Sequence, residues 1–374
     1  MEKKLRSGFT TGSCAAAASK AAAWMLLTGE EKDSIRIFTP SGRAFDAEIL
    51  DTQRGRDSVK CAVRKDGGDD PDVTTGALIY ADVRMSDSGG VRVDGGEGVG
   101  RVTRPGLDQP PGEAAINSVP RSMIRQELDD VAEACSYDGG FDVIISVPGG
   151  GEIASRTFNP RLGIEGGISI IGTSGIVEPM SEQAILDTIK VELRQKKAEG
   201  CTTAFVSPGN YGLDFMREEY GIDLDRSVKC SNFIGLTVDM VRELGFSGML
   251  LTGHAGKLVK VAGGIMNTHS READCRMEII ASAAAREGAP SELIRSILDS
   301  LTTEEAFAKL KGADPELADR TAADLVERII SSLRRRAGGE LDIECIMYTK
   351  ENGLVASSEG AGAMIKANRE NWNG

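Results

Sequence analysis

The stretch FDVIISVP at residues 141–148 decides the fold class, because it is a short and almost continuously apolar run between turn residues. Strands that are buried on both faces of a sheet have this pattern. Similar runs alternate with segments of helical pattern further along the chain, namely GISIIG (167–172), TTAFVSP (202–208), SGMLLTG (247–253) and DIECIMYT (342–349). This alternation predicts a mainly parallel sheet covered by helices and joined by right-handed crossovers.

The apolar runs lie within residues 119–350, which we interpret as an α/β domain that carries glycine-rich ligand loops. Residues 270–337 have a helical pattern interrupted by Pro290 and Pro315, so we expect a helical C-terminal region. Residues 351–374 are expected to form a C-terminal tail.

The sequence before this domain has a different pattern. Hydroxyl residues at 10–13 precede an alanine-rich run, which predicts a helix that ends near residue 27, before Gly29. Four extended segments with turn residues between them follow, namely SIRIFTP (34–40), RAFDAEIL (43–50), SVKCAVR (58–64) and ALIYADVRM (77–85). Residues 1–118 are therefore predicted to form an α+β domain with a mostly antiparallel sheet.

Composition excludes several classes of protein. The 44 Lys and Arg against 57 Asp and Glu give a formal net charge of −13, which opposes binding to a phosphate backbone. Aromatic residues make up 5%, too few for base stacking, so no nucleic-acid partner is expected. No apolar run reaches the roughly 18 residues of a membrane span, so no membrane association is expected.

Cysteine and histidine usage predicts a reduced, cytoplasmic protein without a structural metal. The seven cysteines are scattered and form no CxxC pair, and there are two histidines. Lys20 interrupts the N-terminal apolar run, so we interpret that run as an amphipathic helix rather than an export signal. A homo-oligomer is compatible with the sequence.

Glycine is unusually frequent, with 45 residues that cluster in short loops. GFTTGSCAAAA (8–18) places hydroxyls and glycines before a helix, which suits either an anion or simple helix capping. DPDVTTG (70–76) and GGEGVGRVTRPGL (95–107) form a second glycine-rich region. Its Arg101 and Arg104 can present guanidinium groups to carboxylates, and a mobile hairpin is the alternative.

The third glycine-rich loop, VPGGGEIASRTFNPRLGIEGG (147–167), follows a predicted strand. Its spacing fits a G-x-G-x-x-A dinucleotide-binding turn, which would open a long helix, but Pro160 and the glycines after it leave no room for one. NAD binding is therefore disfavoured. The loop still concentrates polar groups beyond a strand end, where α/β sheets bind ligands: Glu152, Arg156, Asn159 and Arg161.

Three further loops complete the set of candidates. GTSGIVEPMS (172–181) offers backbone amides and the hydroxyls of Thr173 and Ser174 to a cofactor, with a tight structural turn as the alternative. SPGNYG (207–212) follows a strand. The last region runs from KCSNFIG (229–235) through GHAGKLVKVAGG (253–264) to THSREAD (268–274).

That last region has a local excess of positive charge. Seven basic and four acidic residues lie between positions 226 and 276, so a cationic pocket for a polyanion is expected from Lys229, Lys257, Lys260 and Arg271. His254 and His269 lie in loops flanked by glycine or serine, and each is either structural or catalytic. We expect all these loops to converge on one positively charged crevice for an anionic small molecule.

Taken together, the motifs resemble the cobalt-precorrin-5B C(1)-methyltransferase family, the CbiD type. The resemblance runs in order from about residue 5 to 275, through GFTTGSCAAAASKAA, GGEGVGRVTRPGL, GEAAINSVPR, NPRLGIEGGISIIGTSGIVEPMS, KCSNFIG and GHAGKLVKVAGG with THS. It implies transfer of a methyl group from S-adenosylmethionine to C-1 of cobalt-precorrin-5B. The product is cobalt-precorrin-6A, on the anaerobic route to cobalamin (vitamin B12), and cobalt enters only within this tetrapyrrole substrate.

The implied chemistry suggests roles for the candidate residues. We expect S-adenosylmethionine to bind the loops 149–151 and 172–175, through Gly149, Gly150, Gly151, Gly172, Thr173, Ser174 and Gly175. Substrate carboxylates are expected to bind Arg101, Arg104, Arg156, Asn159, Arg161, Lys257 and Lys260. His254 or His269 would accept the proton lost on methylation or face the cobalt, and Glu152 is the alternative base.

Three other functions stay open on the residues alone. A non-catalytic tetrapyrrole or anion carrier would bind the ring but not S-adenosylmethionine. A nucleotide-dependent oxidoreductase would need the long helix after Gly151. A purely structural oligomer would leave the glycine and arginine clustering without a reason.

Overall fold

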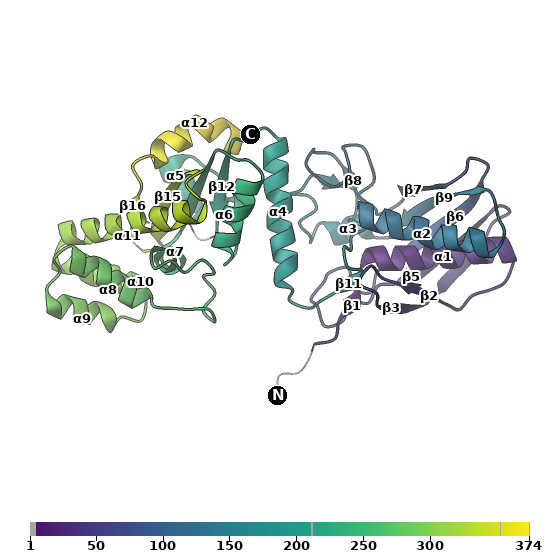
Figure 1. Cartoon of the computed structure of the whole chain (residues 1–374), viewed down its shortest axis with the longest axis horizontal. Helices are drawn as coiled ribbons and strands as arrows, with labels where there is room; N and C mark the ends of the chain where they lie inside the picture. Colours follow the sequence, from purple (N-terminus) through teal and green to yellow (C-terminus); the bar gives the residue numbers. More distant parts are fainter. Residues whose placement is uncertain (1–4, 211, 352, 374) are drawn as a thin grey trace. The chain divides into compact units, whose positions relative to one another are not determined.

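The computed structural model describes residues 5–210, 212–351 and 353–373, and the chain divides into two compact units (Figure 1). We call Met1–Ser181 the N-terminal unit and Glu182–Gly374 the C-terminal unit. Both combine helices with a five-stranded sheet. The predicted order of an α+β part followed by an α/β part with C-terminal helices is confirmed. None of the helices in the described ranges is long and apolar enough to cross a bilayer.

The N-terminal unit is built on a mostly antiparallel sheet, in the order β4 (Leu50–Arg54), β5 (Ser58–Arg64), β6 (Leu78–Ser86), β9 (Gly140–Ser146) and β7 (Val91–Gly95). Its other elements are β1 (Gly8–Phe9), α1 (Thr11–Thr28), β2 (Ser34–Phe38), β3 (Ala44–Glu48), β8 (Arg101–Val102), α2 (Ser118–Ala134), α3 (Gly150–Ala154), β10 (Ile164–Glu165) and β11 (Ile176–Val177). Helix α1 packs on β5 and β6 and lies beside α2 (Figure 1). Its fully buried alanines let the helix approach both neighbours closely.

The boundary predicted after residue 118 is wrong, because the stretch 141–148 belongs to the N-terminal sheet. Strand β9 pairs antiparallel with β6 and parallel with β7. A short apolar run does not reveal the direction of its neighbours, so the pattern fits either kind of sheet. The predicted strand 167–172 is also wrong, since Ile168 and Ile170 make only isolated bridges, to Val99 and Ile116.

The C-terminal unit holds the parallel sheet. Its order is β13 (Val228–Lys229), β12 (Thr203–Ser207), β14 (Gly248–His254), β15 (Asp342–Thr349) and β16 (Gly353–Ser357), and only β16 runs antiparallel. The helices are α4 (Glu182–Ala198), α5 (Leu213–Tyr220), the 3₁₀ turn η1 (Leu224–Arg226), α6 (Ile234–Glu243), α7 (Ala255–Ala262), α8 (Arg276–Arg286), α9 (Ser291–Leu298), α10 (Thr303–Ala313), α11 (Pro315–Arg336) and α12 (Ala361–Asn373).

The segment expected as a tail, 351–374, is part of this unit. Strand β16 extends the sheet beside β15. Helix α12 places Trp372 in the core, where its ring stacks on Phe205 at 5.1 Å and its indole N–H donates to the Thr203 carbonyl. The predicted tail is therefore corrected to a strand and a packed helix, because small and polar residues dominate this segment and leave only a weak apolar pattern.

Three glycines of the N-terminal unit let loops touch backbone to backbone, and we call Gly98, Gly150 and Gly167 the glycine junction. A Cβ on Gly98 would lie 1.8 Å from the Val147 carbonyl oxygen. A Cβ on Gly150 or Gly167 would lie 2.1 or 2.2 Å from the Gly98 oxygen. The same oxygen accepts a hydrogen bond from Ile168 N at 2.9 Å. Only glycine fits these three positions.

We predict that Gly98→Ala destabilises the N-terminal unit by more than about 2 kcal/mol, since the added methyl collides with backbone and Gly98 has a φ of 72°. Gly89→Ala is the control, because a Cβ there meets nothing within 4 Å. Thermal unfolding followed by calorimetry measures both. Equal melting temperatures for the two variants would contradict the role given to the junction.

Candidate functional site

The first glycine-rich loop caps helix α1. Thr10 is the N-cap, and its hydroxyl accepts a hydrogen bond from Ser13 N at 3.2 Å. Gly12 N donates to the Ile171 carbonyl at 3.0 Å. These backbone donors, which could have bound an anion, are satisfied within the protein. The geometry therefore supports the capping interpretation of residues 8–18.

The loop 172–175 supports the start of the same helix. A Cβ on Gly172 would lie 2.1 Å from the Thr10 hydroxyl, and one on Gly175 would lie 2.7 Å from Thr39. The Gly175 carbonyl accepts a hydrogen bond from Ser13 Oγ at 2.8 Å. These contacts give both glycines a structural reason, as expected of a tight turn. Cofactor binding by Thr173 and Ser174 stays a prediction.

The loop 149–151 has more free space around its first glycine than the loop 172–175 has around Gly172 and Gly175. Gly149 has a φ of 75°, and a Cβ there would meet nothing within 4 Å, whereas Gly150 is locked into the glycine junction. Gly151 begins no long helix, since α3 ends at Ala154. The oxidoreductase alternative, which needed that long helix, is therefore wrong. Glu152 is exposed in the first turn of α3.

Two of the predicted substrate ligands organise loops instead. Arg101 makes two hydrogen bonds to Asp94, at 2.8 and 3.0 Å, and a third to the Gly95 carbonyl at 2.9 Å. Asn159 donates to the Gly167 carbonyl at 3.2 Å and accepts from Ser169 at 3.2 Å. These side chains hold the loops in place, and their binding to substrate carboxylates stays a prediction.

The other arginines of this unit lie at its surface. The side chain of Arg104 packs over Gly163, and the Gly163 carbonyl accepts a hydrogen bond from Thr103 N at 2.8 Å, so two arginine-bearing loops lie side by side. Arg156 and Arg161 are exposed. Phe158, which sequence reasoning missed, is 55% exposed between them. An exposed aromatic ring among arginines suits a flat, carboxylate-bearing ligand.

In the C-terminal unit, the strand order places the carboxyl ends of β12 and β14 at a topological switch point. The chain crosses from β12 to β13 on one side and returns to β14 on the other. Open α/β sheets bind ligands at this position. Lys257 joins the loops there, donating to the Pro208 carbonyl at 3.0 Å and the Ser231 carbonyl at 3.4 Å. Burial lowers the pKa of Lys257.

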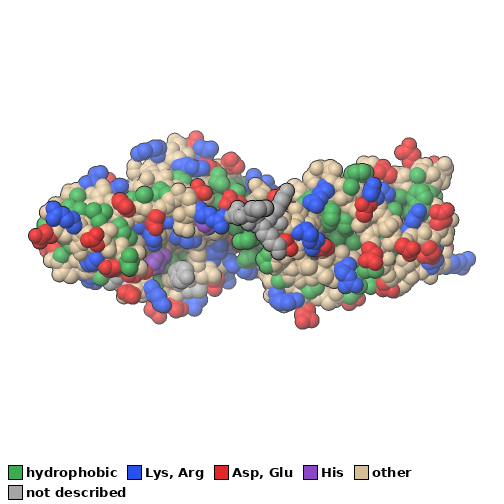
Figure 2. Space-filling view, turned by 90° about the horizontal axis from the view of Figure 1, so that it is seen from below, with side chains coloured by type: hydrophobic (Ala, Val, Ile, Leu, Met, Phe, Trp, Pro, Cys, Tyr) green, Lys and Arg blue, Asp and Glu red, His purple; other side chains and the backbone are tan. Residues whose placement is uncertain are grey.

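The three lysines of the expected cationic pocket donate hydrogen bonds within the protein, whereas Arg271 is exposed. Lys260 is 4% exposed and donates to the carbonyls of Thr268 and Ala273. Lys229 donates to the Leu224 carbonyl and to Ser227. Figure 2 shows basic and acidic side chains interspersed over the visible face of the molecule. These lysines join neighbouring loops, and binding of a polyanion by this region stays a prediction.

Both histidines accept a backbone hydrogen bond at Nδ1, His254 from Gly256 N and His269 from Arg271 N, each at 3.1 Å. In a neutral imidazole the other nitrogen, Nε2, then carries the proton. Nε2 of His254 lies 2.8 Å from Glu304 Oε1. The geometry therefore favours both histidines as hydrogen-bond donors, and their role as proton acceptors stays a prediction.

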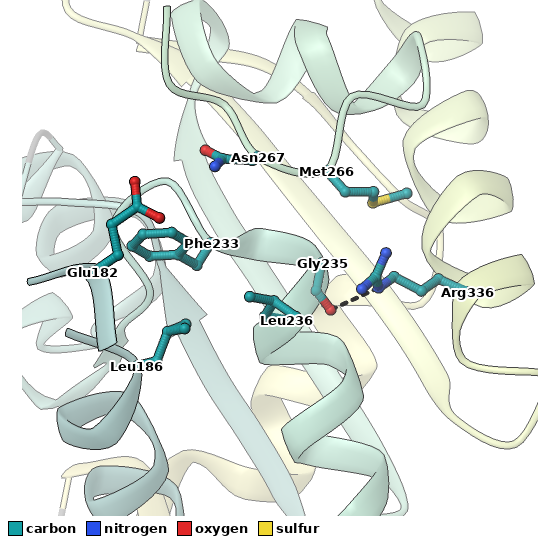
Figure 3. Close-up of a pocket in the computed structure, with 8 residues that line it drawn as sticks. All are labelled: Glu182, Leu186, Phe233, Gly235, Leu236, Met266, Asn267 and Arg336. Atoms are coloured by element: carbon teal, nitrogen blue, oxygen red, sulfur yellow. Dashed lines mark hydrogen bonds between the residues drawn. The ribbon is translucent and has the colours of Figure 1, made fainter. Parts of the chain in front are cut away.

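The C-terminal unit also has a pocket of about 240 Å³ that sequence reasoning did not identify (Figure 3). It is lined by Glu182, Leu186, Phe233, Gly235, Leu236, Met266, Asn267 and Arg336. Two of the motifs that carried the family resemblance, KCSNFIG and the segment before THS, contribute to it. The presence of both motifs was the only sign of this pocket in the sequence. Neither motif by itself predicts that the two segments line one cavity.

Comparison with known proteins shows which family the chain belongs to. Residues 1–179 match the CbiD family, and residues 267–359 match the family described as CbiD, C-terminal domain. The chain belongs to the CbiD family.

Its curated relatives are named cobalt-precorrin-5B C(1)-methyltransferase. The protein of Ruminiclostridium cellulolyticum is 49% identical, over 97% of this chain and 95% of its own length. The protein of Thermoanaerobacter sp. is 47% identical, over 95% of this chain and 96% of its own length. A crystal structure described as a CbiD cobalamin biosynthesis protein from Archaeoglobus fulgidus is 26% identical, with a TM-score of 0.39, over 71% of this chain and 83% of that chain.

We predict that Lys260→Met destabilises the C-terminal unit by about 1–3 kcal/mol, because two buried carbonyls lose their donor and the loop that carries His269 is released. Lys311→Met, at an exposed position on α10, is the control. Thermal unfolding measures stability, and hydrogen exchange over 268–273 measures the loop. Exchange as slow as in the wild type would contradict the proposal that Lys260 holds this loop in place.

Proposed function

We propose that this chain transfers the methyl group of S-adenosylmethionine to C-1 of cobalt-precorrin-5B, giving cobalt-precorrin-6A and S-adenosylhomocysteine in cobalamin biosynthesis. The observation that carries the proposal is the identity of 42–49% to relatives of that name, over nearly the whole chain. Each of the two units is covered by these matches. Cobalt enters as part of the substrate.

The reaction is a displacement at the methyl carbon. The C-1 carbon supplies the electron pair of the new carbon–carbon bond, and the sulfonium sulfur keeps the pair of the bond that breaks. Such a transfer depends mainly on holding two reactants in line, and well-oriented reactants lower the barrier by about 7–11 kcal/mol. The protein's main task is therefore to bind and orient both molecules.

The exposed arginines of the N-terminal unit support the proposal for the substrate side. Arg104 and Arg156 make no ion pair with a carboxylate in the described part of the chain, so their guanidinium groups are available to the acetate and propionate groups of the ring. Phe158 offers an apolar face to the macrocycle. Arg161 belongs to the same loop and is proposed to act with them.

Proton removal is proposed to fall to Glu152, which is exposed next to the open turn at Gly149. His254 and His269 are proposed to donate Nε2–H hydrogen bonds, in keeping with their backbone contacts. We place the reaction in the cytoplasm, because the seven cysteines are free thiols. No nucleic acid takes part in this chemistry.

We predict that Arg156→Gln raises the KM for cobalt-precorrin-5B about tenfold while kcat changes little, because the arginine contributes binding rather than chemistry. Arg56→Gln, an exposed arginine of the same unit, is the control. Steady-state kinetics with the purified protein measures both. An unchanged KM in the Arg156 variant would remove this arginine from the substrate site.

The proposed function itself is tested by incubating the purified protein with cobalt-precorrin-5B and S-adenosylmethionine carrying a labelled methyl group. Mass spectrometry should show the label in the tetrapyrrole and an equal amount of S-adenosylhomocysteine. A protein that binds the ring without transferring the label would be a carrier instead of an enzyme.

A further inference from the structure

We propose that the pocket beside Phe233, in place of the loops 149–151 and 172–175 expected from the sequence, holds the adenosine part of the methyl donor, an inference that rests on the proposed function. We call this pocket, lined by the eight residues in Figure 3, the Phe233 pocket. Neither the family matches nor the relatives' names assign a ligand to it. Its position, shape and charge each support this ligand.

The position follows from the topology of the C-terminal unit. Helices α4 and α6 each precede a parallel strand, so their N-terminal turns lie at the carboxyl edge of the sheet. Glu182 and Leu186 lie near the start of α4, and Gly235 and Leu236 near the start of α6. The pocket is therefore on the side where parallel sheets bind cofactors.

The lining suits a flat heteroaromatic base. Leu186, Leu236 and Met266 supply apolar walls, and Phe233 supplies an aromatic ring. Aromatic side chains contact bases of every kind, and the 7% of Phe233 that is exposed is the part a base can reach. At about 240 Å³ the cavity is smaller than a typical whole-ligand site, so it fits one part of a ligand and excludes a tetrapyrrole macrocycle.

A hydrogen-bond donor of fixed orientation lies in the same pocket. Asn267 Oδ1 accepts from His269 N at 3.1 Å, which leaves the amide NH₂ to donate. Figure 3 shows the Asn267 amide and the Glu182 carboxylate near the ring of Phe233. An NH₂ group can donate to a ring nitrogen of adenine, and a carboxylate can accept from its amino group or from ribose hydroxyls.

Charge distinguishes the methyl donor from the substrate. Arg336 is neutralised, because its guanidinium binds Asp239 at 2.6 and 3.0 Å and the Gly235 carbonyl at 2.8 Å. Glu182 makes no ion pair among the described residues, so its carboxylate places a negative charge at the rim of the pocket. A negative rim repels the carboxylates of the tetrapyrrole and attracts a sulfonium cation.

The test is isothermal titration of S-adenosylhomocysteine into the full chain and two pocket variants. Leu236→Trp fills the cavity from its 41% exposed position, and Asn267→Leu removes the donor. We expect the Kd to rise about tenfold or more for each. Leu298→Trp, at a similarly exposed site on α9, should bind as the wild type does.

The KM for S-adenosylmethionine in the labelled methyl-transfer assay is measured for the same variants, and it reports on the pocket even if the donor binds only after the tetrapyrrole. If both pocket variants keep the wild-type KM and Kd while methyl transfer proceeds, the pocket assignment is wrong and the proposed function stands. If the wild type neither binds S-adenosylhomocysteine nor transfers the label, both fail. Melting temperatures confirm that the variants are folded.

Discussion

Backbone contact between loops at Gly98, Gly150 and Gly167 is the constraint on which the N-terminal unit depends. No other residue lets these carbonyls and Cα atoms approach so closely. The contact brings the turn at Gly149 beside the segment that leads into β8 and the segment that follows β10, and so helps to determine where Arg104 and Arg156 reach the surface. The glycine-rich motifs therefore have a structural role, and we propose that the exposed side chains around them bind the ligand.

In the C-terminal unit, loops are joined by two lysine ammonium groups, one partly buried and one buried. Lys257 and Lys260 each donate to two carbonyls, and they join the loops that follow β12, β13 and α7. An ammonium group has three donors and no acceptor, so one lysine can satisfy several buried carbonyls. These bonds place the segments around His269, Phe233 and Asn267, which sequence alone treats as separate motifs.

The sequence predicts the helix at 11–28, the antiparallel strands and the parallel sheet, because each depends on local periodicity. It fails at β9, whose partners come from segments fifty or more residues away in the chain, and at α12, whose packing has no strong local pattern. For the site, it identifies the loops but does not predict the internal hydrogen bonds of Arg101, Asn159 and Lys260. Whether a polar side chain faces a ligand or a neighbouring carbonyl is a tertiary property, which residue type and spacing do not encode.

We propose that the C-terminal unit holds the methyl donor, at the start of α6 and the segment 266–269. Hydrogen–deuterium exchange of the full chain with and without S-adenosylhomocysteine tests it directly, since a bound ligand slows exchange where it binds. We expect protection at 229–237 and 265–269, with little change at 149–151 and 172–175. Protection of those two glycine loops alone would contradict it.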